Sequence, residues 1–128
     1  MLIHGVGVDM VHIPRIEAAL GRFGEKFAHR ILGEMELEAY AEVRNRPAML
    51  GKHFAAKEAY VKALGTGFRF GISWRDIQVG HEELGRPCLV VSGRALAVSA
   101  DYRISGSHLS ITDESDHALA FVTLLKVA

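Results

Sequence analysis

The sequence predicts an α+β fold in which an antiparallel sheet packs against one long buried helix. Helical patterns dominate the first half of the chain and short β-rich segments the second, so helices and strands do not alternate as in a doubly wound fold. Segment 53–64 is apolar almost all round, which is typical of a buried helix. The length of 128 residues favours a single domain, 1–128.

The expected order of elements is β-α-α-α-β-β-α-β-β. Segment 2–11 is short and β-branched, which predicts the first strand. A helix follows near Pro14, because the fixed φ of proline suits the first helical turn. The second helix covers 33–43. The third runs from Pro47 to Leu64 and ends at the sequence GTG.

The second half predicts four strands and one helix. Strands 73–80 and 87–93 form a hairpin with Gly85 in its turn. A modest helix covers 93–103. Two more strands, 107–112 and 118–127, flank the polar turn DESD.

Composition and charge argue against several classes of protein. The formal net charge is zero, whereas a dedicated nucleic-acid binder is usually basic. No segment has the length or hydropathy of a membrane span or of a signal peptide. Cys88 is the single cysteine, so the chain forms no internal disulfide and suits a reducing, cytoplasmic setting.

The first strand carries a face almost without side chains. Side chains alternate along a strand, so Gly5, Gly7 and Asp9 share one face. Such glycines mark the close approach of another backbone or of a ligand. One interpretation packs this face on the long helix, with Asp9 capping the helix near Pro14. A dinucleotide-binding turn is disfavoured because the third glycine is missing.

Glu58 and Lys62 are unexpected on an apolar helix. Their spacing of four residues allows a structural ion pair. The alternative is a phosphate site, in which Asp9 and Glu58 hold Mg²⁺ and Lys62 binds phosphate oxygens. The glycines that flank Thr66 would then let the backbone approach the phosphates.

Three motifs then point to a known family. GVGVDMVHIPRIE and FAAKEAYVKALGTG resemble the two signatures of the 4′-phosphopantetheinyl transferases. SHLSIT, near the end of the chain, is similar to a motif of the short bacterial members. The motifs occur in the family's order and cover nearly the whole chain. The resemblance implies transfer of phosphopantetheine from coenzyme A to a serine of apo acyl carrier protein, for fatty acid biosynthesis, with release of adenosine 3′,5′-bisphosphate.

The resemblance also assigns roles around the pyrophosphate. It implies that Asp9 and Glu58 ligate Mg²⁺ there and that Lys62 contacts the same pyrophosphate. Gly65 and Thr66 would lie along the coenzyme. The general base stays open between Glu58 and a water oriented by Asp9.

Further contacts are implied toward the nucleotide end of coenzyme A. His108 and Thr112 match positions that help to hold that end, and Pro87 matches a turn on the adenine side. His53 stands where many relatives have arginine, so any contact it makes with a phosphate would be weaker at neutral pH.

The short members of the family form trimers with the coenzyme between subunits, so the resemblance implies a homotrimer. Their carrier protein is acidic. Arg15 and Arg22 share a helix face at a spacing of seven residues, and Lys26 extends it, so we expect this face to dock the carrier protein.

Two rival functions use the same residues. A Mg²⁺-dependent nucleotide hydrolase would transfer the phosphate to water and need no carrier protein. A non-catalytic binding domain would bind the nucleotide whether or not Mg²⁺ is present.

Overall fold

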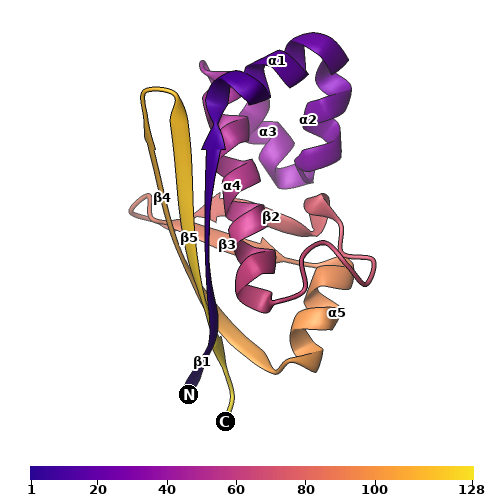
Figure 1. Cartoon of the computed structure of the whole chain (residues 1–128), viewed down its shortest axis with the longest axis vertical. Coiled ribbons are helices and arrows are strands. Elements are labelled where there is room, and N and C mark those ends of the chain that lie inside the picture. Colours follow the sequence, from indigo (N-terminus) through magenta and orange to yellow (C-terminus); the bar gives the residue numbers. More distant parts are fainter.

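In the computed structural model, which describes all 128 residues, one long helix lies against a three-stranded antiparallel sheet. The helix is α4 (Arg46–Leu64), and the sheet contains β1 (Leu2–His12), β5 (His117–Lys126) and β4 (Ile104–Glu114) in that order (Figure 1). Twelve residues of α4 are buried, so this helix forms the centre of the core.

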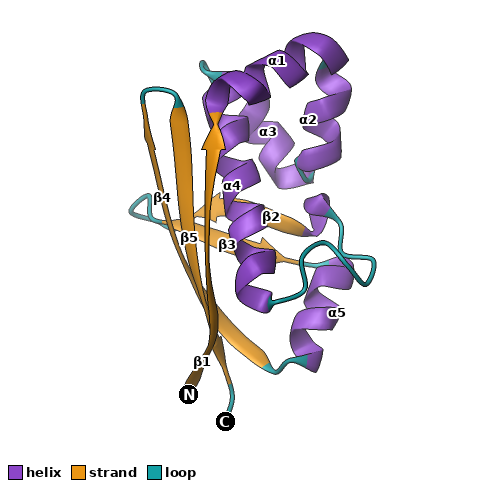
Figure 2. Ribbon diagram, viewed as in Figure 1, coloured by secondary structure: helices purple, strands orange, loops and turns teal.

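The remaining elements surround α4 (Figure 2). Three short helices cluster at one end of the molecule: α1 (Ile13–Phe23), α2 (Glu25–Ile31) and α3 (Glu34–Glu42). A second antiparallel sheet and a last helix complete the chain: β2 (Ile77–His81), β3 (Pro87–Val91) and α5 (Gly93–Asp101).

The glycine face of β1 packs directly on the backbone of α4. A Cβ at Gly7 would lie 2.0 Å from the carbonyl oxygen of Ala59, and one at Gly5 would lie 2.3 Å from that of Ala63. Only glycine permits this approach. The interpretation that this face packs on the long helix is therefore confirmed, and the packing fixes β1 against the side of α4 that carries Glu58 and Lys62.

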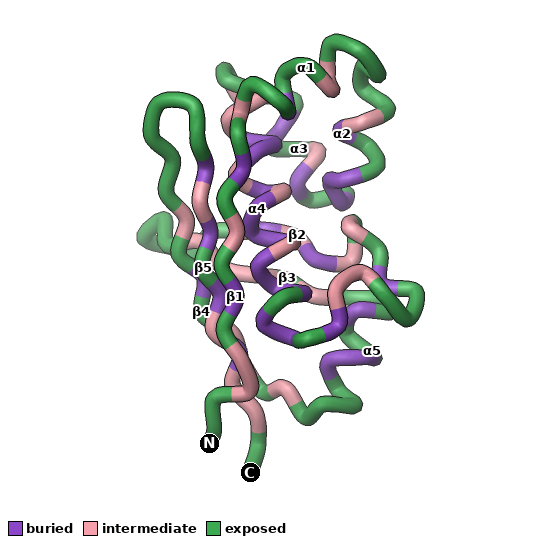
Figure 3. The backbone as a smooth tube through the Cα atoms, in the orientation of Figure 1, coloured by how far each residue is buried: buried purple, intermediate pink, exposed green.

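Burial changes from residue to residue along the strands of the large sheet (Figure 3), because side chains alternate between its two faces. On β5, Ala118, Ala120, Val122 and Leu124 are fully buried against α4, while the residues between them point to the opposite, outer face. That outer face exposes large apolar side chains, namely Val6, Val8, Met10 and Phe121. Apolar patches of this kind mark interaction surfaces.

The predicted fold class and order of elements are confirmed, with three differences. A short helix, α2, separates α1 from α3. Segment 73–80 begins as a 3₁₀ turn, Trp74–Asp76, because Ser73 and Asp76 cap it. The strands form two sheets rather than one. Gly85 does form the hairpin turn, at φ 93°. None of the helices combines the length and apolar composition that crossing a bilayer requires.

Candidate functional site

A cleft of about 400 Å³ opens between the end of β1, the start of α1 and the middle of α4. Asp9, Glu58 and Lys62 all line it, together with Arg15 and Phe54. The structure thus brings the three predicted catalytic residues to one place. Local geometry explains this, because Asp9 lies on the face of β1 that meets α4, and Glu58 and Lys62 are one helical turn apart.

Lys62 pairs with Asp9 and not with Glu58. Its Nζ donates to Asp9 Oδ1 at 3.0 Å and to the carbonyl oxygen of Val8 at 3.1 Å. Glu58 makes no hydrogen bond or ion pair, so the Glu58–Lys62 structural pair allowed by their spacing does not form. Asp9 does not cap α1 either, because His12 is the N-cap residue and that helix has no side-chain cap.

The carboxylates of this cleft influence one another. Burial and the nearby Asp9 carboxylate raise the pKa of Glu58, and the Lys62 ammonium only partly opposes them. Nowhere in the structure are three or more histidine, cysteine or acidic side chains grouped so that they could hold a metal ion by themselves. Two oxygen ligands with room for water are what Mg²⁺ takes beside a phosphate, so the side chains present fit that ion.

The turn after α4 uses its backbone N–H groups to end the helix. The N–H groups of Gly65, Thr66 and Gly67 all donate to the carbonyl oxygen of Val61. Thr66 is buried, and its hydroxyl donates to the carbonyl oxygen of Gly67. These N–H groups therefore serve to end the helix, with Gly65 at φ 91°, and are not available to a phosphate.

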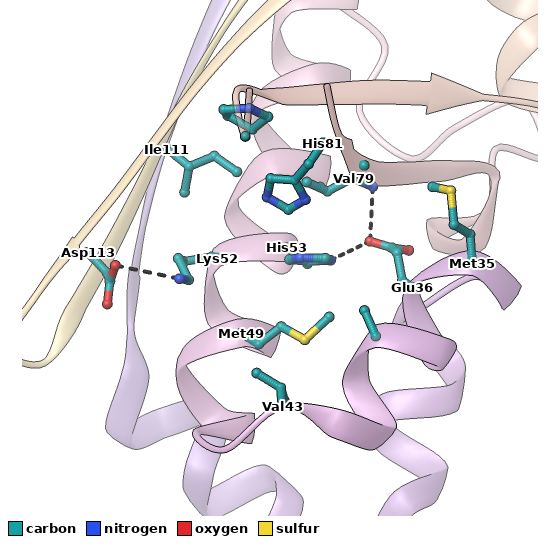
Figure 4. A pocket seen from close by; sticks show the side chains of 14 residues that line it. Met35, Glu36, Val43, Met49, Lys52, His53, Val79, His81, Ile111 and Asp113 are labelled. Atoms are coloured by element: carbon teal, nitrogen blue, oxygen red, sulfur yellow. Dashed lines mark hydrogen bonds and ion pairs between the residues drawn. The ribbon is translucent and has the colours of Figure 1, made fainter. Parts of the chain in front are cut away.

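A second cavity, of about 590 Å³, lies between α3, α4, β4 and the β2–β3 hairpin (Figure 4). His53 and Pro87, two of the expected coenzyme contacts, line this cavity and not the Asp9 cleft. Lys52 crosses from α4 to pair with Asp113 of β4 at 3.7 Å.

His53 belongs to a buried cluster of charged groups that sequence reasoning missed. Its Nδ1 donates to Glu36 Oε2 at 2.6 Å, and Lys57 Nζ donates to Glu36 Oε1 at 2.6 Å. The backbone N–H groups of Gly33 and Val79 also donate to this carboxylate. Burial alone would raise the pKa of Glu36, but the His53 hydrogen bond and the Lys57 charge hold it below its usual value. Lys57 itself could have indicated this cluster, because a lysine buried on an apolar helix needs an acidic partner.

His108 and Thr112 lie on the outer face of the sheet. Thr112 of β4 and Met10 of β1 both lie opposite Leu119 of the central strand β5, so they share its face. His108 and Val6 likewise both lie opposite Thr123 of β5. Asp9, by contrast, lies in the inner row with Ala120. One chain therefore does not bring His108 and Thr112 to the Asp9 cleft.

The two arginines of α1 are both exposed. Arg15 lines the Asp9 cleft, and Arg22 lies over the ring of Phe23 at 5.2 Å. Phe23 is itself exposed, and Ile16 is the buried residue of this helix. Lys26 is also exposed.

Comparison with known proteins gives the class of this fold and site. The family model described as the 4′-phosphopantetheinyl transferase superfamily matches residues 5–122, and the chain belongs to that superfamily. Within it, the chain is 44% identical over 123 residues to a holo-[acyl-carrier-protein] synthase of Vibrio cholerae, covering 96% of this chain and 98% of that protein.

Solved structures agree with this grouping. The holo-[acyl-carrier-protein] synthase of Neisseria meningitidis superposes with a TM-score of 0.93 at 40% identity, over 98% of this chain and 100% of that chain. The synthase of Helicobacter pylori in complex with coenzyme A superposes with a TM-score of 0.82 at 28% identity, over 94% and 99%.

Proposed function

We propose that this protein is a holo-[acyl-carrier-protein] synthase, which transfers 4′-phosphopantetheine from coenzyme A to a serine of apo acyl carrier protein. The observation that carries the proposal is the cleft that holds Asp9, Glu58 and Lys62 together in a chain of this superfamily. Relatives that bear this name cover almost the whole chain, and one of them was solved with coenzyme A. A location in the cytoplasm, where coenzyme A and carrier proteins meet, is part of the proposal.

The chemistry is phosphoryl transfer. The serine oxygen attacks the β-phosphorus of coenzyme A and forms a new P–O bond. The bond from that phosphorus to the bridging oxygen breaks, and adenosine 3′,5′-bisphosphate leaves with the electron pair. The Lys62 ammonium, which lines the cleft, would donate to the phosphate oxygens. The serine proton passes to Glu58 or to a water held by Asp9.

Mg²⁺ belongs to the proposal as the cofactor. Asp9 and Glu58 would hold it, because they are the two carboxylates of the cleft and Glu58 has no other charged or hydrogen-bonding partner. When bound, the ion supplies positive charge against the pyrophosphate. Bound positive charge would also oppose the burial and the Asp9 repulsion that together raise the pKa of Glu58.

We further propose a homotrimer with the coenzyme between subunits. The outer face of the sheet exposes Val6, Val8 and Met10 of β1 beside Phe121 of β5, which favours burial against another copy. The same face carries His108 and Thr112, so a neighbouring subunit could supply these residues to the cleft. Light scattering should give three 14.0 kDa chains for the wild type. Val8→Glu should give the monomer, and a monomeric wild type would refute the proposal.

Arg15 and Arg22 are proposed to dock the acidic carrier protein by charge complementarity. Arg15 also lines the cleft, so docking would bring the serine to the phosphate. Arg22→Glu, at a residue outside the cleft lining, should raise the KM for carrier protein and leave coenzyme A affinity unchanged. Equal effects on both substrates would refute this role.

Intact-protein mass spectrometry tests the whole proposal. The protein, Mg²⁺, coenzyme A and apo acyl carrier protein are mixed, with and without EDTA. A gain of one phosphopantetheine on the carrier, abolished by EDTA, supports the synthase. Cleavage of coenzyme A with an unchanged carrier supports the hydrolase, and binding of coenzyme A without either change supports the binding domain. Asp9→Ala and Glu58→Ala should each lower the rate about a hundredfold or more.

A further inference from the structure

Three aromatic rings form a continuous stack next to the Asp9 cleft. The ring centroids of Phe54 and Trp74 are 4.6 Å apart, and those of Trp74 and Phe68 are 4.0 Å apart. The interplanar angles are 28° and 23°, so both pairs are stacked. We call Phe54, Trp74 and Phe68 the aromatic row. All three side chains pack on the core but remain partly exposed.

The aromatic row begins inside the cleft. Phe54 lines the cleft itself and lies one helical turn before Glu58 on α4. The backbone of Trp74 is fixed to α4, because its carbonyl oxygen accepts a hydrogen bond from the buried Lys57 Nζ at 3.0 Å. Phe68 directly follows Gly67, whose N–H bonds to the end of α4. All three residues of the aromatic row are therefore fixed, directly or through neighbouring residues, to α4.

Core packing explains the buried faces of these rings but not their exposed edges. Exposing the apolar edges of one Trp ring and two Phe rings to water is unfavourable, so a ligand that covered them would gain binding free energy. The cleft at one end of the row is polar and charged, with two carboxylates and an ammonium. A ligand that matches both surfaces has a charged end and an extended, largely apolar arm.

We propose that the aromatic row binds the pantetheine arm of coenzyme A. This inference rests on the proposed function, which places the β-phosphate at Glu58 and Lys62. The arm is esterified to that phosphate, so it must leave the cleft across an adjoining surface. Its geminal methyl groups and methylenes suit aromatic edges, and its two amides remain free to bond with water. The row is continuous with the cleft, since Phe54 belongs to both.

The single tryptophan makes a direct test possible. Trp74 is the only tryptophan in the chain, so intrinsic fluorescence reports on the row without a label. Three probes are titrated in the presence of Mg²⁺: coenzyme A, 4′-phosphopantetheine and adenosine 3′,5′-bisphosphate. We expect the first two to change Trp74 emission and the third, which has no arm, to leave it unchanged. Equal changes with the nucleotide and coenzyme A would overturn the inference, because adenine would then occupy the row.

Calorimetry separates this inference from the proposed function. If coenzyme A binds and the carrier is modified while Trp74 emission stays constant, the synthase stands and the aromatic row is not the arm site. If coenzyme A neither binds nor reacts, both proposals fail.

A variant pair adds a kinetic test. Phe68→Ala should raise the KM for coenzyme A roughly three- to tenfold with little change in kcat, because apolar contact is lost away from the reacting atoms. Phe70→Ala is the matched control, since Phe70 lies in the same loop, is exposed and stacks on no ring of the row. Equal KM values for the two variants would refute the inference. If Phe68→Ala fails to fold, the titration of the wild-type protein still decides.

Discussion

Replacing Glu36 by Gln should destabilise the protein severely, although Glu36 lies outside the Asp9 cleft. Glu36 is 1% exposed and Lys57 is 0% exposed, so the substitution leaves an uncompensated ammonium in the core. Removing one partner of a buried ion pair costs about 3–5 kcal/mol. That is a large part of the roughly 5–15 kcal/mol that holds a domain of this size together.

The structure also predicts an asymmetry between the two partners. After Lys57→Met, the Glu36 carboxylate still accepts from His53 and from the backbone N–H groups of Gly33 and Val79. After Glu36→Gln, the Lys57 ammonium loses its ionised hydrogen-bond partner and is left with neutral acceptors, among them the carbonyl oxygens of Trp74 and Ile77, while the Asp76 carboxylate acts on it only through its charge. Glu36→Gln should therefore cost more than Lys57→Met, and the double variant should cost less than the sum of the two.

Urea unfolding measures these differences, with Glu82→Gln as the control. Glu82 pairs with Arg86 at 2.8 Å, but both side chains are largely exposed, so this substitution should cost less than about 1 kcal/mol. If Glu36→Gln were no worse than Glu82→Gln, the buried cluster would contribute nothing to folding and our account of it would be wrong.

The same cluster predicts an acid dependence. The pKa of Glu36 is lower in the folded protein than its usual value of 4.5, so the folded state binds the proton less readily than the unfolded state. This contribution to stability is complete above pH 4.5 and is lost as the pH falls through the folded pKa. Glu36→Gln removes the group, so its stability should fall less steeply with acid than that of the wild type.

Two further predictions concern β1 and the cleft. Gly7→Ala should lower the free energy of unfolding in urea by about 3 kcal/mol or more, because the added Cβ meets the backbone of α4. The control is Gly21→Ala, in open space on α1, which should be neutral or stabilising by about 0.5–1 kcal/mol. Equal effects of the two substitutions would refute the close approach of β1 to α4. Glu58→Gln should raise the melting temperature at pH 7 but not near pH 4, because the ionised form of Glu58 is disfavoured in the folded protein. Mg²⁺ should raise the melting temperature of the wild type more than that of this variant. The same Mg²⁺ effect on both proteins would exclude Glu58 as a ligand.

Local patterns in the sequence were sufficient to predict most elements and the core of the site. The alternation of Gly5, Gly7 and Asp9 predicted a face that meets the long helix, because the period of a strand is a local property. The apolar circumference of segment 53–64 predicted its burial in the same way. Both patterns depend only on neighbouring residues, so they can be recognised without knowledge of the tertiary structure.

Partners that are distant in the sequence could not be predicted in this way. The spacing of Glu58 and Lys62 shows that they can meet, but the competing acceptor, Asp9, lies 53 residues from Lys62 and only the packing of β1 on α4 brings it near. Lys57 likewise indicates that an acidic partner is needed, but the sequence does not show that this partner is Glu36 on α3. The division of the strands into two sheets is also long-range, since β2 and β3 pair with each other whether or not they join the larger sheet.

The split of the candidate residues across the sheet explains why the sequence predicts more contacts than one chain brings together. Strand alternation puts Ile111 with Asp9 in the inner row and places His108 and Thr112 on the opposite face. No rotamer brings a side chain through a paired sheet. Either these two residues act in the site of a neighbouring copy, or they do not contact the coenzyme. The light-scattering measurement on the wild type and on Val8→Glu therefore bears on the site as well as on the assembly, because a trimer is the arrangement that would let one cleft use both faces.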